Sequence, residues 1–194
     1  MAPMPSTEKQ TLNDELRATL LEVARDSIRY GLQHGRPLTV DPADYPEPLG
    51  EERASFVTLN IDGRLRGCMG HLEAVAPLVV DVADNAYAAA FRDPRFPPLS
   101  NAEFDDLELH ISVLSKPEPM QFSSEEDLLK QIRPGEDGLI LEDGFAKGTF
   151  LPSVWESLPK ARDFLAHLKV KAGLPPDYWS PSLKVYRYET ESFA

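Results

Sequence analysis

The spacing of apolar residues along the chain predicts alternating helices and strands. Residues 12–33 carry leucine, isoleucine and valine side chains mostly three to five positions apart, which is the period of an amphipathic helix. Thr11 is a candidate N-cap for this helix, and Gly35 with Pro37 ends it. Residues 36–54 hold four prolines and no sustained period, so we expect a long surface connector there.

A hairpin followed by a helix is predicted next. Residues 55–61 alternate β-branched or aromatic residues with polar ones, as strands do, and the Asp-Gly pair at 62–63 is a favoured hairpin turn. Residues 65–69 form the return strand. Pro77 suits the first turn of a helix over residues 76–91, which is rich in alanine and valine.

The second half of the chain predicts a further set of strands and helices. Residues 107–114 alternate strictly between apolar and polar side chains, which indicates a half-buried strand, and Ser100 with Glu103 has the spacing of a capping box. The other expected elements are helices over 123–132, 152–158 and 160–172 and strands over 138–142, 145–150 and 183–188. Strands joined by tight turns, with helices between them, favour an α+β fold with a mainly antiparallel sheet and packed helices.

Length and composition indicate the number of domains and the cellular compartment of the protein. With 194 residues we expect a flexible leader over residues 1–11 and one domain, with room for a smaller lobe, over residues 12–194. No apolar run approaches the ~18 residues that span a bilayer, and the first residues lack the pattern of a secretory signal. The single cysteine excludes an internal disulfide, so we expect a cytoplasmic protein.

The charge balance restricts the partners. The net charge is −12, and residues 101–143 carry most of it, with 12 acidic residues against 3 basic ones. Nonspecific nucleic-acid binding depends on cations that displace phosphate counterions, so nucleic acid is disfavoured, and anionic membranes are disfavoured for the same reason. We expect residues 101–143 to form a solvated acidic face, with a basic partner as the alternative.

Candidate chemistry gathers in residues 63–71, which hold three glycines, two arginines, a histidine and the only cysteine. Side chains alternate along a strand, so Arg66 and Cys68 share a face, and the length of the hairpin loop decides which face that is. A two-residue loop turns both toward the apolar side of the hairpin. A three-residue loop leaves them beside Asn60 and Thr58 and satisfies burial better, so we expect Cys68 on the more polar face next to Arg66.

This placement favours a site for a small-molecule ligand. A guanidinium stabilises a nearby thiolate, so Cys68 is a candidate nucleophile or redox centre and Arg66 its activating group. Gly67 and Gly70 leave room for a ligand or for another backbone, and His71 is a candidate base or ligand-binding group. The alternative interpretation, a structural cysteine in a tightly packed hairpin, stays open.

The loop at residues 93–99 supplies a second candidate. Its prolines hold Arg95 and a phenylalanine rigidly, so Arg95 either binds an anionic ligand or pairs with Asp93 or another acid. Metal binding is disfavoured, because a closed zinc site needs four ligands and no second cysteine exists. The chain has no nucleotide-binding glycine motif either, and we expect no cofactor.

The string Leu65-Arg66-Gly67-Cys68-Met69-Gly70, named here the LRGCMG motif, resembles the L-R-G-C-I-G hallmark of the AMMECR domain family. Further segments match the family in the same order: Phe56-Val57-Thr58-Leu59, Asp93-Pro94-Arg95-Phe96, Ser112-Val113-Leu114-Ser115, Asp137-Gly138-Leu139 and Lys171-Ala172-Gly173-Leu174. Met69 replaces the usual isoleucine, and Ala54-Ser55 stands where a small residue and glycine are frequent.

The resemblance covers residues 12–193 and carries its own expectations. It implies an α+β fold with a larger and a smaller lobe and the motif near the cleft between them. Prokaryotic members are named AmmeMemoRadiSam system protein A, which implies a Memo-like protein and a radical-SAM protein as partners. No reaction comes with the resemblance, so a non-catalytic accessory subunit of that system is the alternative to a catalytic or ligand-binding cleft.

Overall fold

The computed structural model describes residues 11–194 and divides them into two compact units. Unit 1 contains the described residues up to Val113 together with Glu191–Ala194, and unit 2 contains Leu114–Thr190. Each unit has a four-stranded sheet and an apolar core of its own, so the α+β class is confirmed, with two sheets instead of one. The leader expected at residues 1–11 lies outside the described residues, apart from Thr11.

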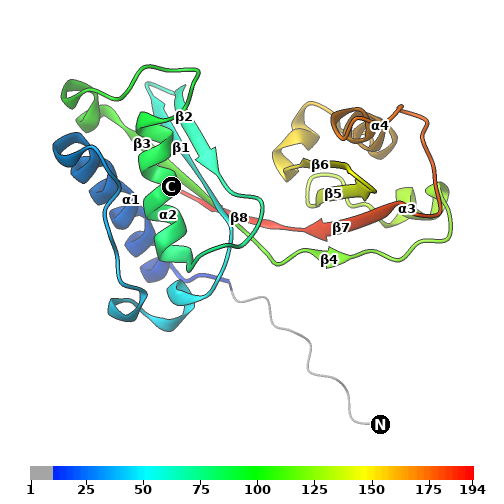
Figure 1. The fold of residues 1–194 in the computed structure, drawn as a ribbon, viewed down its shortest axis with the longest axis horizontal. Coiled ribbons are helices and arrows are strands. Elements are labelled where there is room, and N and C mark those ends of the chain that lie inside the picture. The colour runs from blue at the N-terminus through cyan, green and yellow to red at the C-terminus, as the bar shows by residue number, and fades with distance from the viewer. Residues whose placement is uncertain (1–10) are drawn as a thin grey trace, which may run out of the picture. The chain divides into compact units, whose positions relative to one another are not determined.

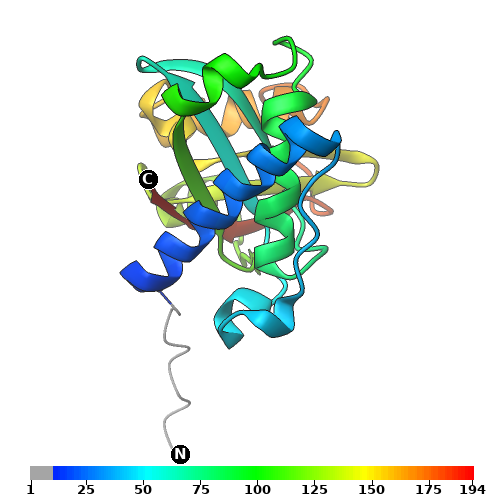
Figure 2. The same cartoon turned by 90° about the vertical axis from the view of Figure 1, so that its left-hand side faces the viewer.

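Unit 1 is a sheet covered on one face by two helices, α1 and α2 (Figure 2). The strand order is β2-β1-β3-β8, and β1 is antiparallel to both of its neighbours. The elements are α1 (Asp14–His34), η1 (Pro42–Asp44), η2 (Glu47–Gly50), β1 (Ser55–Ile61), β2 (Arg64–Gly70), α2 (Leu78–Phe91), η3 (Asn101–Asp106), β3 (Glu108–Leu114) and β8 (Thr190–Phe193).

Helix α1 follows the predicted apolar period but begins two residues later. The N-cap is Asn13, not Thr11, because the Asn13 side chain accepts a hydrogen bond from the Leu16 N–H at 2.9 Å. Gly35 ends the helix in the left-handed region at φ 70°, as its position predicts. The capping box predicted at the start of η3 is also present.

The loop of the β1–β2 hairpin is shorter than the three-residue loop that was predicted. The turn has two residues, since Ile61 pairs with Arg64, and positive φ angles at both turn positions match the preference of an Asp-Gly pair. A β-bulge then shifts the register by one residue at Arg66. Cys68 therefore still pairs with Thr58, as expected, but Arg66 has no direct partner on β1.

The bulge also reverses two expected exposures. Leu65 was expected on the buried face, but it pairs with Asn60 on the other face and is 42% exposed. Arg66 was expected on the polar face and is only 8% exposed. Compared with a two-residue hairpin that has no bulge, the inserted residue moves every later side chain of β2 to the opposite face. The hairpin therefore keeps the two-residue turn that Asp-Gly favours and still places the later apolar side chains on the buried face.

Helix α2 packs directly on β2 because residue 67 has no side chain. A Cβ atom at Gly67 would overlap the carbonyl oxygen of Ala89. Four alanines of α2 (Ala83, Ala86, Ala89 and Ala90) are almost fully buried, so the helix presents a flat surface to the sheet. Pro77 is the N-cap of α2 and not part of its first turn.

Unit 2 contains the strand order β4-β7-β5-β6, with α4 packed near β6 (Figure 1). Its core includes Phe164 stacked on Trp155, with ring centroids 3.8 Å apart. Strands β4 and β8 were not predicted, because two and four residues are too few to show a period. The elements are β4 (Glu118–Pro119), α3 (Glu125–Gln131), β5 (Gly138–Asp143), β6 (Ala146–Phe150), η4 (Pro152–Glu156), α4 (Ala161–Lys171) and β7 (Lys184–Tyr188).

The acidic segment 101–143 is not a uniformly solvated face. Asp137 is fully buried, and its carboxylate accepts hydrogen bonds from Arg133 and Arg187. Buried carboxylates of this kind are stable only when paired, so part of the charge of this segment serves packing. Within residues 11–194, no helix combines the length and apolar character needed to cross a lipid bilayer.

Replacing Gly67 by alanine should destabilise the protein by about 3 kcal/mol, because the new methyl group overlaps backbone atoms that cannot move away cheaply. Urea unfolding measures the effect. Gly50→Ala is the matched control, since its Cβ meets only Pro42 Cβ at 3.9 Å. Equal stability of the two variants would contradict the packing described for α2.

Candidate functional site

Cys68 is a free, half-buried cysteine in the edge strand β2. Its sulfur lies 3.2 Å from the hydroxyl oxygen of Thr58, its partner across the hairpin. Its backbone N–H donates to the Asp93 carboxylate at 3.0 Å. The Asp93 side chain thus accepts a hydrogen bond from a backbone N–H of the edge strand, and this bond fixes β2 at Cys68.

Asp93 also holds Arg95. The guanidinium donates to the two carboxylate oxygens at 3.0 and 2.7 Å, and the Arg95 backbone N–H donates at 3.1 Å. Only 2% of the Asp93 side chain is exposed, whereas 55% of the Arg95 side chain is. The Arg95 hydrogen bonds, with those from backbone N–H groups, hold the pKa of Asp93 far below its usual value, against the opposing effect of burial.

Arg95 is within electrostatic reach of the cysteine. Its pKa is raised, chiefly by the hydrogen bond to Asp93 and, in a smaller part, by interaction with Cys68. The pairing of Arg95 with Asp93, one of the two alternatives left open by the sequence, is therefore present. It leaves 55% of the Arg95 side chain exposed to solvent.

Arg66 forms its hydrogen bonds with residues other than Cys68. Its guanidinium donates to Glu103 at 2.7 and 3.3 Å and to the Pro97 carbonyl at 2.8 Å. The Arg66 hydrogen bond is the main reason that the pKa of Glu103 falls to about 2. Within the described part of the chain, its remaining nitrogen, Nη1, is buried without a hydrogen-bond partner.

Phe96 links the two arginines. The guanidinium carbon of Arg66 lies 5.8 Å from the centre of the ring, and that of Arg95 lies 5.5 Å away. Both distances are within the range of cation–π attraction. The 93–99 loop is therefore fastened along β2 by the hydrogen bonds of the Cys68 N–H to Asp93 and of Arg66 to the Pro97 carbonyl, and by the contact of Arg66 with the Phe96 ring.

The space left by the two motif glycines is filled by the protein itself. Gly67 faces the Ala89 carbonyl of α2, and Gly70 faces the ring of Phe56. Both residues therefore have a packing role, which agrees with the structural interpretation of these positions.

His71 reaches α2 and not the cysteine. Its Nδ1 atom lies 2.6 Å from a carboxylate oxygen of Asp81, which is 1% exposed, while the His71 side chain is 46% exposed. The other Asp81 oxygen accepts from the Ser55 hydroxyl at 2.6 Å and the Asn85 amide at 2.9 Å. Because α2 covers the opposite face of the hairpin from Thr58, His71 and the thiol face different sides of the sheet.

The network around Asp81 was missed by sequence reasoning, although a signal existed. Asp81 and Asn85 lie four residues apart in a helix otherwise dominated by alanine and valine, so they share its buried side. Polar residues that recur on an apolar face indicate a buried hydrogen-bond network. Asp84, one turn along, has a raised pKa, first from desolvation and then from the charge of Asp81.

The predicted site residues therefore fall into three groups. Cys68 lies near Arg95, Arg66 pairs with Glu103, and His71 pairs with Asp81. Across residues 11–194, no cluster of three histidine, cysteine or acidic side chains is arranged to hold a metal ion.

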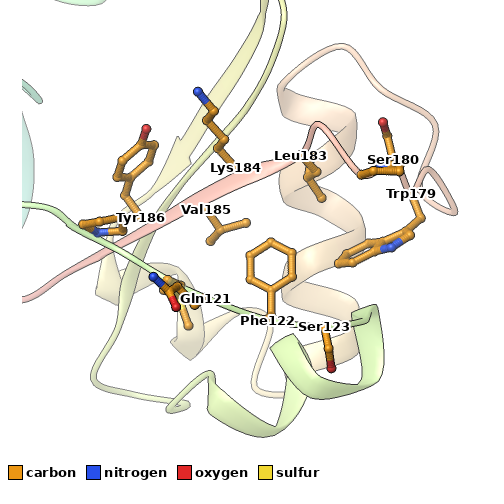
Figure 3. Close-up of a pocket in the computed structure, with 12 residues that line it drawn as sticks. Gln121, Phe122, Ser123, Trp179, Ser180, Leu183, Lys184, Val185 and Tyr186 are labelled. Atoms are coloured by element: carbon orange, nitrogen blue, oxygen red, sulfur yellow. The ribbon is translucent and has the colours of Figure 1, made fainter.

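A pocket of about 470 Å³ lies in unit 2 and contains none of the predicted site residues. It opens where the chain leaves β4 and diverges from β7, and the rings of Phe122 and Trp179 lie next to each other in its lining, tilted and with ring centres 5.5 Å apart (Figure 3). Val185 points toward Phe122, whereas Lys184 projects from the other side of β7. Trp179 is half-exposed and Trp155 is buried.

Comparisons with known proteins find a family model and relatives that match most of the chain. A family model described as AMMECR1 matches residues 21–193. A protein of Methanothermobacter thermautotrophicus is 41% identical over 181 residues, which cover 90% of this chain and 92% of that protein. One from Thermococcus gammatolerans is 41% identical over 193 residues, covering 94% and 91%.

The solved structures include a match of the same kind. The crystal structure of an uncharacterized protein from Pyrococcus horikoshii superposes with a TM-score of 0.80 at 38% identity, and the match covers 93% of this chain and 92% of that one.

Replacing Glu103 by glutamine should lower stability by about 1–2 kcal/mol at neutral pH, because Arg66 stays buried without its charged partner. A carboxyl with a depressed pKa stabilises the fold above its unfolded value near 4.5, and this contribution is lost as the pH falls toward about 2. The difference between wild type and variant, measured by urea unfolding, should shrink below pH 4.5.

Asp106→Asn is the control for Glu103→Gln. Asp106 belongs to the same 3₁₀ helix, is exposed and makes no ion pair within the described residues. A loss of stability as large as that of Glu103→Gln would mean that overall charge, and not the Arg66 pair, is responsible.

Proposed function

Since this chain belongs to the AMMECR1 family, we propose that the LRGCMG motif is the centre of a small-molecule site in which the Cys68 thiol is the reactive group. The thiol acts there as a nucleophile or a redox centre. Arg95 binds an anionic part of the ligand, which is one of the two roles that the sequence leaves open for it.

The observation that carries this proposal is the shared carboxylate of Asp93. It accepts both the Cys68 N–H and the Arg95 guanidinium, so the Arg95 side chain, paired with Asp93 and yet 55% exposed, is held at the same carboxylate as the half-buried Cys68. A thiolate next to a cation is stabilised relative to the thiol, and a cation that faces solvent attracts anions.

Arg66 has a supporting role in this site. Its charge is paired with Glu103, and its side chain is almost buried, so it offers little to a ligand in the present arrangement. By bonding the Pro97 carbonyl and contacting the Phe96 ring, it fastens the 93–99 loop that carries Arg95.

Alkylation with two reagents of different charge tests the site. Anionic iodoacetate and neutral iodoacetamide react with the same thiolate, so their rate ratio reports the local positive charge. We expect a ratio several-fold higher for Cys68 than for free glutathione. Arg95→Gln should lower this ratio by about threefold to tenfold, because the anion loses its attraction to the guanidinium.

Arg64→Gln is the matched control. Arg64 lies on the same strand, is exposed and has no ion-pair partner among residues 11–194, so the net charge changes equally. The proposal fails if wild-type Cys68 discriminates no better than glutathione, or if both variants lower the ratio by the same factor.

An accessory subunit is the second candidate, and exposed apolar side chains beside the motif favour it. Leu65 is 42% exposed and Val75 63% exposed, on segments that flank Cys68 in the chain. Exposed leucine and valine near one another in the sequence suit a contact surface for a partner protein. The partner would be a Memo-like protein or a radical-SAM protein, and the motif would then serve the interface.

Co-expression with a Memo-like protein separates the two candidates. The accessory function predicts a complex that survives Cys68→Ser and is weakened at least about tenfold by Leu65→Glu, because a charge replaces a buried apolar contact. Size-exclusion chromatography and calorimetry measure both effects. Absence of a complex with purified Memo-like and radical-SAM proteins would exclude this candidate.

A further inference from the structure

We propose that His71 is a proton-transfer residue, whose Nε2 atom accepts a proton from a hydroxyl group or a water while Asp81 holds the ring through Nδ1. The inference goes beyond the proposed function, because His71 contacts α2 and the Cys68 thiol faces the other side of the sheet.

The first support is the burial of Asp81. Its side chain is 1% exposed, and no lysine or arginine within the described residues pairs with it. A carboxylate removed from water is costly unless a positive charge or several hydrogen bonds compensate it. Three donors contact this one, and only His71 among them can become positively charged.

The second support is the orientation of the carboxylate. Ser55 and Asn85 both bind one oxygen, and the other oxygen faces the imidazole. Asn85 also donates to the Ser55 carbonyl at 3.1 Å, so the network is anchored to the backbone of β1. A carboxylate fixed in this way keeps the proton of a neutral imidazole on Nδ1 and leaves the lone pair on Nε2.

The third support is the exposure of the ring. Nearly half of the His71 side chain faces solvent, and its Nε2 atom makes no hydrogen bond within the described residues. When Nε2 takes a proton from an O–H group, the ring becomes an imidazolium and the oxygen is left as the nucleophile. The positive charge then lies beside the Asp81 carboxylate, which stabilises it.

Two other histidines of the chain serve as internal references. His34 and His167 are exposed, and their Nδ1 atoms lie near backbone carbonyls, of Tyr30 at 3.2 Å and of Asp163 at 2.9 Å. These rings therefore share the exposure and the Nδ1 contact of His71 but lack the charged partner. A difference in reactivity at Nε2 can be assigned to Asp81.

Acylation with diethyl pyrocarbonate at neutral pH tests the inference on the full-length chain. The neutral nitrogen attacks the reagent, and mass spectrometry of peptides follows each histidine separately. We expect His71 to react about tenfold faster than His34 and His167, since a carboxylate holds the Nδ1–H proton more strongly than a backbone carbonyl does and so keeps the lone pair on Nε2. Asp81→Asn should remove this advantage and leave the two references unchanged.

Asp84→Asn is the control, because it removes the same charge from the same helix, and Asp84 acts on the His71 ring only through space, with no hydrogen bond between them among the described residues. It should leave the His71 rate within about twofold of wild type, as the field of a more distant exposed charge is screened. A second measurement needs no variant: nitrogen-15 NMR of the wild-type chain should detect the Nδ1–H tautomer of His71.

The inference is overturned if His71 reacts no faster than the reference histidines, if Asp84→Asn acts as strongly as Asp81→Asn, or if the neutral ring carries its proton on Nε2. Because the first and third results come from the wild-type chain, a folding defect of Asp81→Asn does not remove the test. Failure of the iodoacetate experiment would leave these outcomes unaffected, so the two proposals are judged separately.

Discussion

The contact between the Ala89 carbonyl and the backbone of Gly67 determines how closely α2 approaches β2. One side of the helix carries Asp81 to His71, and the chain that follows the helix brings Asp93 back along the same strand. A side chain at position 67 would push the helix away from the sheet and separate both pairs. Two features that differ in chemistry therefore depend on one backbone contact, and the glycine of the LRGCMG motif serves packing.

The buried carboxylates of unit 1 differ in the partner that compensates them. Asp93 and the half-buried Glu103 pair with arginines, whose charge is permanent, so these pairs do not exchange protons near neutral pH. Asp81 pairs with a histidine, whose charge changes with protonation. The net charge of −12 says nothing of this difference, because it counts exposed and buried carboxylates alike.

Local patterns predicted most of the helices and strands, since periods of two and 3.6 residues are visible within a short stretch of sequence. The hairpin loop was predicted wrongly because burial alone was used to choose between two registers. The bulge at Arg66 satisfies both the Asp-Gly turn and the pairing of Cys68 with Thr58. A bulge leaves no clear pattern in a sequence, because it inserts a single residue and the alternation of side chains continues after it.

By itself the sequence determined the α+β class, the family resemblance, the position of the β1–β2 hairpin and the segment in which the candidate site residues gather. The tertiary structure alone decided which of these residues meet: Cys68 lies near Arg95, and His71 contacts Asp81. These pairings depend on how a helix is seated on a strand edge. Hydrophobic periodicity shows that a face is buried but not against which residue, so the partners of buried charges become known only when the elements are packed.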